Sequence, residues 1–302
     1  MTVGPAFRSG FVAVVGRPNV GKSTLINALV GSKISIVTPK PQTTRHRILG
    51  VVSDPDCQMV FVDTPGLHGS AGKAMNRLMN RAADNAIRDA DLILFMSEAN
   101  RWTVEDENAL KRVADGRGRV PVIALINKID KVHPKSELLQ VIADRAAAFA
   151  FAEVIPISAR YLDNLDRLVQ LIPGLLPESP PLFPEETMTD RSDAFLAAEL
   201  IREKLTLALR QEVPYGLTVE IERFDRQDGA LAIGAIIWVE RDSQKGIVVG
   251  KGGSLLKKAG RAVRLELKEH YGVPVHVELW VKVRDNWADS EEQLLRLGYD
   301  SE

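Results

Sequence analysis

A glycine-rich turn between an apolar strand and a helix constrains this chain more than any other feature of its sequence. Residues 16–23 read GRPNVGKS and follow the apolar run FVAVV at 11–15. The turn fits the pattern G-x-x-x-x-G-K-[ST], in which backbone N–H groups and a lysine surround phosphates. The start of a helix adds unpaired N–H groups and partial positive charge. This context favours a phosphate site over an ordinary strand-to-helix turn.

The residue types in and after this turn suit a nucleoside triphosphate with magnesium. Lys22 is placed to reach the β- and γ-phosphates, and the Ser23 hydroxyl is a Mg²⁺ ligand. The next apolar run, MVFV, is followed by Asp63-Thr64-Pro65-Gly66. Asp63 can hold Mg²⁺ through water, and the Gly66 N–H can meet the γ-phosphate. These two motifs predict a triphosphatase or a kinase.

Two later motifs indicate which base is bound. Asn127-Lys128-Ile129-Asp130 follows the run VIALI, and Ser158-Ala159-Arg160 follows VIPI. The Asp130 carboxylate can accept hydrogen bonds from N1–H and the 2-amino group of guanine, a donor pair that adenine lacks. Backbone N–H groups of the second motif can contact guanine O6. Each motif alone could be a capped turn, but ligands gather where parallel strands end, so together they predict a guanine nucleotide site.

The predicted nucleotide site also includes a mobile loop, residues 33–47, that contains Thr43-Thr44-Arg45. This loop resembles the first switch of small GTPases, and the resemblance implies that Thr44 is the second Mg²⁺ ligand. We assign catalytic roles to Lys22, Thr44 and Gly66. The residues expected to contact GTP are Gly16, Arg17, Pro18, Asn19, Val20, Gly21, Lys22, Ser23, Thr24, Asp63, Thr64, Pro65, Gly66, Asn127, Lys128, Asp130, Ser158 and Ala159.

The hydrolysis rate is expected to be slow. Leu67 follows the Asp-Thr-Pro-Gly motif, where Ras-like enzymes carry a glutamine that orients the attacking water. Leucine forms no hydrogen bond with water. Asn19 suggests a compensation, because in similar GTPases an asparagine at this loop position helps to bind K⁺ beside the phosphates. We therefore expect K⁺ to stimulate hydrolysis.

The chain divides into two predicted domains. With 302 residues it exceeds the usual size of one hydrophobic core. Residues 1–172 alternate apolar strands with amphipathic helices, which predicts a mostly parallel, doubly wound α/β domain, with HRILGVV at 46–52 as an added edge strand. A proline-rich segment at 173–190 is expected to be a linker. Residues 191–302 are predicted to form an α+β domain in the order α-β-β-α-α-β, with a C-terminal tail.

The second domain contains another glycine-rich turn, Gly250-Lys251-Gly252-Gly253. The stretch IVVGKGGSLL resembles the core of a KH domain, and the element order matches the type II topology, so we expect RNA binding. Although the net charge is −1, residues 241–268 carry eight bases and two acids. The plain alternative is a helix-capping turn followed by a solvated charged face. The predicted RNA-binding residues are Val249, Gly250, Lys251, Gly252, Gly253, Lys257, Lys258, Arg261, Arg264 and Lys268.

The ordered motifs GRPNVGKS, DTPG, NKID and SAR resemble the translation-factor-related small GTPases. Together with the KH-like half, and with the stretches PQTTRHRILG and ELWVKVR, they make the chain similar to the Era family over nearly its whole length. The resemblance implies GTP, GDP and Mg²⁺ as ligands and binding near the 3′ end of small-subunit (16S) ribosomal RNA. It also implies assistance in 30S maturation and a cytoplasmic location, with peripheral contact at the inner face of the membrane. We expect a monomer.

Three alternatives remain open on sequence grounds. A related GTPase could act on transfer RNA modification or on another ribosomal particle. The chain could also be a constitutive RNA-binding module in which the nucleotide only stabilises the fold. A metabolic kinase fits least well, because Asn127-Lys128-Ile129-Asp130 has no use in one.

Overall fold

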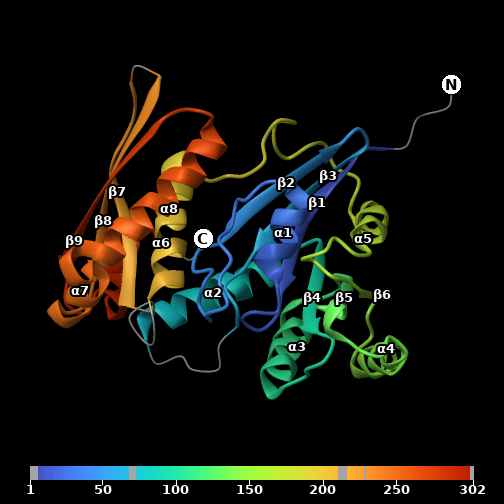
Figure 1. Cartoon of the computed structure of the whole chain (residues 1–302). Helices are drawn as coiled ribbons and strands as arrows, with labels where there is room; N and C mark the ends of the chain where they lie inside the picture. The colour runs from blue at the N-terminus through green and yellow to red at the C-terminus, as the bar shows by residue number, and fades with distance from the viewer. Residues whose placement is uncertain (1–5, 68–72, 210–215, 228, 300–302) are drawn as a thin grey trace.

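The computed structural model describes residues 6–67, 73–209, 216–227 and 229–299 (Figure 1). They form two sheets, each covered by helices. Among these described residues no helix is both long and apolar enough to cross a membrane.

The first domain is built on a six-stranded sheet in the order β2-β3-β1-β4-β5-β6. Only β2 runs antiparallel to its neighbour, and the other pairings are parallel. The edge strand expected from HRILGVV is therefore present. The strands are β1 (Arg8–Val15), β2 (Ile48–Asp54), β3 (Cys57–Asp63), β4 (Leu92–Glu98), β5 (Val122–Asn127) and β6 (Glu153–Pro156).

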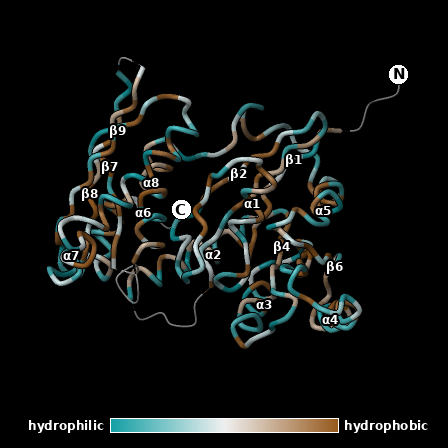
Figure 2. The backbone as a smooth tube through the Cα atoms, in the orientation of Figure 1, coloured by the Kyte–Doolittle hydropathy of each residue, from teal (hydrophilic) through white to brown (hydrophobic). Residues whose placement is uncertain are grey.

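Helices cover both faces of this sheet, which explains why its strands are apolar at nearly every position. On β1, Val12 and Val14 pack toward α1, whereas Ala13 and Val15 pack toward α2 and α3. Figure 2 shows the hydrophobic stretches along the strands. The helices are α1 (Lys22–Val30), α2 (Ala74–Asp89), α3 (Val104–Gly116), α4 (Glu137–Ala148) and α5 (Leu165–Leu171), with 3-10 turns η1 (Ile129–Lys131) and η2 (Ile172–Leu175).

The second domain has a three-stranded sheet in the order β7-β8-β9. Strand β8 is antiparallel to β7 and parallel to β9, and one face packs on the helices around a separate apolar core. Its elements are α6 (Asp193–Ala208), β7 (Leu217–Gln227), β8 (Ala230–Val239), α7 (Asp242–Val249), η4 (Lys251–Gly253), α8 (Ser254–Tyr271) and β9 (Val275–Val283). The predicted order α-β-β-α-α-β and the predicted fold class of both halves are confirmed.

The proline-rich segment 173–190 lies along the first domain. Its backbone accepts hydrogen bonds from the N–H groups of Ser9 at 3.3 Å and Val51 at 2.9 Å. The side chain of Gln58 accepts from the N–H groups of Leu182 and Phe183. The segment therefore extends the first domain's surface before the chain enters α6.

The end of the chain returns to the first domain. After β9, η5 (Trp287–Asp289) and α9 (Glu291–Arg296) bring Trp287, Leu294 and Tyr299 against Met75 and Met79 on α2. The Trp287 side chain is completely buried there. The two domains are thus joined by the C-terminal segment as well as by the connection at 173–190.

Candidate functional site

The first glycine-rich turn connects β1 to α1 at the carboxyl edge of the sheet. Gly21 has φ of 112°, and a Cβ there would lie 2.3 Å from the side-chain nitrogen of Asn127, so only glycine fits. The Lys22 ammonium donates to the carbonyl oxygens of Gly16 at 3.0 Å and Arg17 at 3.1 Å. Burial lowers the pKa of Lys22 to about 8, partly offset by Asp63. Bound phosphates would raise this pKa again, because their negative charge stabilises the protonated ammonium group.

Three oxygen-bearing side chains meet beside Lys22. The hydroxyls of Ser23 and Thr44 are 2.8 Å apart, and Asp63 Oδ2 accepts a hydrogen bond from Ser35 Oγ at 2.6 Å. Asp63 Oδ1 is buried and has no hydrogen-bond partner within the part of the chain that the structure describes. Burial raises the pKa of Asp63, although the Ser35 hydroxyl opposes that rise. Hydroxyl and carboxylate oxygens are the donors that Mg²⁺ prefers, so the set fits this ion.

The predicted base-binding motifs are tied to the phosphate loop by side-chain hydrogen bonds. Asn127 donates to the Val20 carbonyl at 2.8 Å and accepts from the Ala159 N–H at 3.0 Å. Lys128 donates to the Asn19 carbonyl at 2.7 Å. Since each bond joins two different motifs, the loops after β1, β5 and β6 form one rigid rim.

Asp130, the predicted selector of guanine, is held in place by the last of these motifs. The Ser158 hydroxyl donates to its Oδ1 at 2.7 Å, and Ser158 itself is fully buried. This hydrogen bond holds one oxygen of the Asp130 carboxylate and thereby orients the whole group.

A cavity of about 400 Å³ lies between the phosphate loop and the loop 33–47. Predicted site residues and loop residues line it together: Pro18, Asn19, Gly21, Lys22, Ser23, Thr24, Ile36, Val37, Thr38, Pro39, Gln42, Thr43, Thr44, Gly66, Lys128 and Arg160. The two halves of the predicted magnesium site, Ser23 and Thr44, thus face the same space.

Some predicted residues contribute structure to the site rather than side-chain contacts in this cavity. Val20 is fully buried in the core, and the Thr64 hydroxyl donates to the Val14 carbonyl at 2.8 Å. Leu67, which stands where a water-orienting glutamine would be, is buried among apolar side chains. Pro65, the remaining member of that motif, connects Thr64 to Gly66.

The sequence did not indicate the ion pairs that hold Arg17. Its guanidinium lies 3.1 Å from Glu98 and 3.0 Å from Asp106. Asp106 is fully buried and also completes the capping box of α3 with Thr103. That Thr-x-x-Asp pattern was readable as a helix start, but nothing in it named Arg17 as a partner. The Arg17 side chain therefore supports the loop from outside the cavity.

The second glycine-rich turn joins α7 to α8 and needs its glycines. Gly250, Gly252 and Gly253 have φ of 72°, 58° and 77°, a region that other residues seldom adopt. A groove of about 530 Å³ runs from Gly253 between α8 and β9. Lys257, Arg261 and Arg264 line one wall, and residues 276–279 line the other.

The remaining predicted RNA-binding residues lie around this groove rather than in its lining. Lys251, Lys258 and Lys268 are exposed, and Val249 is half-buried. His276 and Glu278 on the β9 wall were not predicted, although they were readable as the polar positions of an alternating strand. The groove thus combines a cationic wall with polar groups that can meet base edges.

Comparison with known proteins finds a family match in each of the two domains. Residues 11–128 match the family model of the 50S ribosome-binding GTPases, and residues 212–288 match the KH domain model. GTPase Era of Stenotrophomonas maltophilia (strain R551-3) is 50% identical over 291 residues, 96% of this chain and 97% of the relative. GTPase Era of Xanthomonas axonopodis pv. citri (strain 306) is 49% identical over 293 residues, 97% of each chain.

Two solved structures are similar over nearly their full length. One is Era in complex with MgGDPNP and nucleotides 1506–1542 of 16S ribosomal RNA, with TM-score 0.92 and 40% identity, covering 97% of this chain and 99% of that one. The other is a variant of Aquifex aeolicus Era bound to GDP·AlF4⁻, with the same TM-score and identity, covering 97% of this chain and 100% of that one.

Proposed function

The chain belongs to the Era family of GTPases, and from that premise we propose that it is a slow GTP-hydrolysing switch that binds the 3′ end of small-subunit ribosomal RNA and assists 30S maturation. The observation that carries the proposal is the joining of a guanine nucleotide site and a KH groove in one chain. The relative solved with MgGDPNP and nucleotides 1506–1542 of 16S ribosomal RNA supports the choice of RNA.

In the proposed reaction the protein positions and neutralises charge. The phosphate-loop amides and Lys22 hold the phosphates, and Gly66 supplies an N–H group to the γ-phosphate. Ser23 and Thr44 would ligate Mg²⁺, and Asp63 would hold it through water. When bound, Mg²⁺ offsets the charge on the phosphate oxygens. Water is the nucleophile, and GDP and phosphate are the products.

Base selection would depend on the rim beyond the phosphates. Asp130 would accept from guanine N1–H and the 2-amino group, and backbone N–H groups near Ala159 would donate to O6. Because Ser158 fixes Asp130 Oδ1 at 2.7 Å, the carboxylate is oriented before the base arrives. A nucleotide lacking this donor pair would leave the carboxylate desolvated and unpaired.

Both the backbone and the bases of the RNA would contact the second domain. The Gly250–Gly253 turn allows close approach of about four single-stranded nucleotides. Lys257, Arg261 and Arg264 on the groove wall would pair with phosphates. Lys251, Lys258 and Lys268, which are exposed around the groove, would extend that contact.

RNA crosslinking in defined nucleotide states tests this proposal. The purified protein is crosslinked to total RNA in the presence of Mg²⁺ with GDP or a non-hydrolysable GTP analogue, and the trapped fragments are sequenced. We expect fragments from the 3′ end of small-subunit RNA. Enrichment of transfer RNA or of large-subunit RNA would overturn the assignment. If calorimetry detects no binding of GDP or GTP, the assignment of the nucleotide site is wrong.

We also propose that K⁺ stimulates hydrolysis through Asn19. Its backbone has φ of 64° and its amide nitrogen donates to the Pro39 carbonyl at 3.0 Å, which places the side chain between the phosphate loop and the loop 33–47. A K⁺ ion there would add positive charge beside the phosphates. We expect faster hydrolysis in KCl than in NaCl, and loss of the difference in Asn19→Ala. Equal rates in both salts would contradict the idea.

A further inference from the structure

Three charged residues on α6 are buried against the first domain. Glu199, Arg202 and Glu203 are 5%, 1% and 3% exposed. Charged side chains are seldom buried so completely unless each has partners. Their partners lie partly within α6 and partly on the loop 33–47, which belongs to the other domain.

Arg202 connects α6 to the residue before Thr44. Its Nε donates to Glu199 Oε1 at 2.7 Å, and another guanidinium nitrogen donates to the Thr43 carbonyl. The intrahelical pair holds the guanidinium in one orientation. The nitrogen that donates to Glu199 Oε2 also donates to the Thr43 carbonyl, and it therefore fixes the peptide group that joins Thr43 to Thr44.

Glu203 binds the same loop at a second point. Its Oε1 accepts from the Val37 N–H at 3.0 Å, and its Oε2 accepts from Lys33 at 2.6 Å. Val37 and Thr43 themselves line the nucleotide cavity, at the two ends of the segment 37–43. Two backbone anchors on one helix therefore set the position of this segment.

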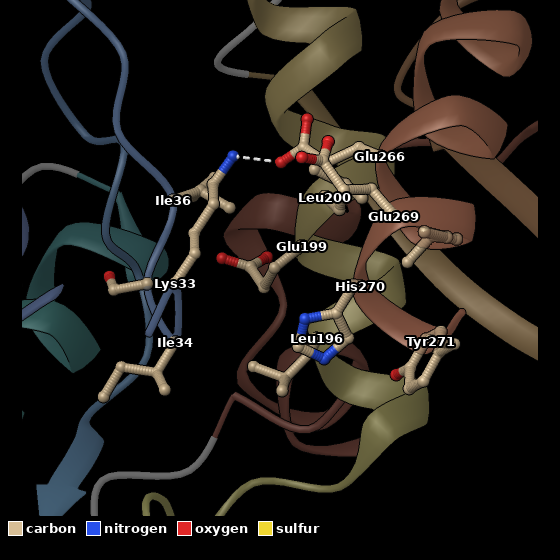
Figure 3. A pocket seen from close by; sticks show the side chains of 12 residues that line it. Lys33, Ile34, Ile36, Leu196, Glu199, Leu200, Glu266, Glu269, His270 and Tyr271 are labelled. Carbon is tan, nitrogen blue, oxygen red and sulfur yellow. Dashed lines mark hydrogen bonds and ion pairs between the residues drawn. The ribbon is translucent and has the colours of Figure 1, made fainter. Parts of the chain in front are cut away.

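A separate ion pair crosses between the domains farther from Thr44. Figure 3 shows Lys33 extending toward Glu266 on α8, beside a cavity of about 210 Å³. The Lys33 ammonium lies 2.6 Å from Glu266. Within the described part of the chain, the ion-pair partners of Glu266 are Lys33 and Lys204 and include none of residues 37–44. Glu266 therefore provides a control for interdomain contact alone.

We infer that Arg202 and Glu203 are positioning residues for GTP hydrolysis. Through these two side chains the RNA-binding domain holds the backbone of the loop 37–44, and this contact sets the position of the Thr44 hydroxyl. The inference rests on the proposed function, because Thr44 matters only as a magnesium ligand. Ser23 Oγ lies 2.8 Å from Thr44 Oγ1, so the anchored loop already brings the two ligands together. Neither Arg202 nor Glu203 lines the nucleotide cavity.

This arrangement couples hydrolysis to the placement of the second domain. Any movement of α6 away from the loop releases both the Val37 and the Thr43 anchors. A displacement of about 1 Å at a catalytic group commonly costs on the order of a hundredfold in rate. GDP would be less affected, because its phosphates and base are held by the phosphate loop and the Asn127–Asp130 motif.

Paired substitutions at Glu203 provide the test. Glu203→Gln keeps an oxygen that can accept from the Val37 N–H, whereas Glu203→Met keeps the volume and loses the acceptor. We expect kcat for GTP to fall about tenfold or more in Glu203→Met and to remain near wild type in Glu203→Gln. We expect the Kd for GDP and the Tm to stay close to wild type in both. Glu266→Met, which removes the acceptor for Lys33 at a residue whose ion-pair partners lie outside the loop 37–44, is expected to leave kcat unchanged.

A double variant tests the other anchor without leaving a buried charge unpaired. Glu199→Met with Arg202→Met removes both members of the pair and the bond to Thr43, and we expect a fall in kcat similar to that of Glu203→Met. Arg202→Lys, which keeps a donor and the charge for Glu199, should recover part of the rate.

The outcomes separate this inference from the proposed function. If Thr44→Ala hydrolyses GTP at the wild-type rate, the magnesium assignment is wrong. If Thr44→Ala is slow but Glu203→Met and the double variant match wild type, the assignment stands and the positioning role is wrong. If Glu203→Gln loses as much activity as Glu203→Met, the charge rather than the Val37 bond is responsible, which also contradicts the inference.

Discussion

Asp130 illustrates how single residues in this protein are prepared for their ligands by neighbours distant in sequence. The Ser158 hydroxyl orients one carboxylate oxygen at 2.7 Å, and Asn127 ties the adjacent loops together. A prepositioned carboxylate loses little conformational freedom on binding, so its hydrogen bonds contribute more to selectivity.

Exchanging the acceptor for an amide should change the base that is bound. In Asp130→Asn the amide oxygen can still accept from guanine N1–H, but the amide nitrogen then faces the 2-amino group, donor against donor. We expect GTP affinity to fall about a hundredfold or more, and xanthosine triphosphate, which has an oxygen at position 2, to bind better than GTP. Competition between the two nucleotides in a fluorescence assay measures this, and unchanged preference for GTP would contradict the assigned role of Asp130.

His46 gives a second prediction at this scale. Its ring stacks on Tyr299 at 4.2 Å and meets Phe195 edge-on. Burial lowers the pKa of His46 to about 4, with Arg202, Arg191 and Arg45 acting in the same direction and Glu199 opposing them. As the pH falls, His46 is therefore protonated at a higher pH in the unfolded chain than in the folded one.

Stability should consequently fall as the pH drops from 6.5 toward 4. The contribution of His46 is fully present above the unfolded pKa of about 6.5 and amounts to about 3 kcal/mol of the free energy of unfolding, lost progressively toward pH 4. Urea unfolding at pH 7 and pH 4.5 measures the loss, with His46→Phe as the variant that should show a smaller one. Identical pH dependence in both proteins would exclude His46 as its source.

At the scale of elements, the turn Gly250–Gly253 and helix α8 form the unit that we propose contacts RNA. Three glycines of the turn have positive φ, and the cationic wall of α8 begins one turn later. Backbone approach and side-chain charge are therefore supplied by consecutive residues.

Placing carboxylates in this turn should remove RNA binding without removing the nucleotide site. We expect Gly252→Asp with Gly253→Asp to weaken RNA binding about a hundredfold or more, because two negative charges would face the phosphates, while the Kd for GDP stays unchanged. Gly246→Asp on α7 is the matched control, since a Cβ there has open space and the backbone has no positive φ. Equal loss in both variants would place the RNA elsewhere.

Elements were also the scale at which the sequence was most informative. Uninterrupted apolar strands, the edge strand β2 and the order of elements in the second half follow from local patterns, and the structure confirms them. The ion pairs of Arg17 with Glu98 and Asp106 could not be predicted, because they join residues that only the fold brings together. The hydrogen bonds of the segment 173–190 with β1 and β2 could not be predicted for the same reason. A high density of prolines indicates that a segment is stiff, but it does not indicate which surface the segment packs against.

At the scale of the whole molecule, the domains contact each other through the loop 33–47 and through helix α2. Helix α6 holds the backbone at Val37 and Thr43, and the C-terminal segment packs Trp287 on α2, the helix that follows the Asp63–Gly66 motif. Neither contact could be predicted from the sequence, because charged residues such as Glu199 and Arg202 on a helix are typical of a solvent-exposed face. The second domain is thus packed against the loop that carries Thr44 and against the helix that follows the Asp63–Gly66 motif.

The most direct measurement is the affinity for RNA spanning the 3′ end of the small-subunit transcript, determined with Mg²⁺ and either GDP or a non-hydrolysable GTP analogue. We predict about tenfold tighter binding with the analogue, in the usual range of coupling between two sites. The Glu203→Met variant should reduce that ratio. Equal affinities in the two nucleotide states of the wild-type protein would contradict a switch. The nucleotide site and the RNA site would then bind their ligands independently.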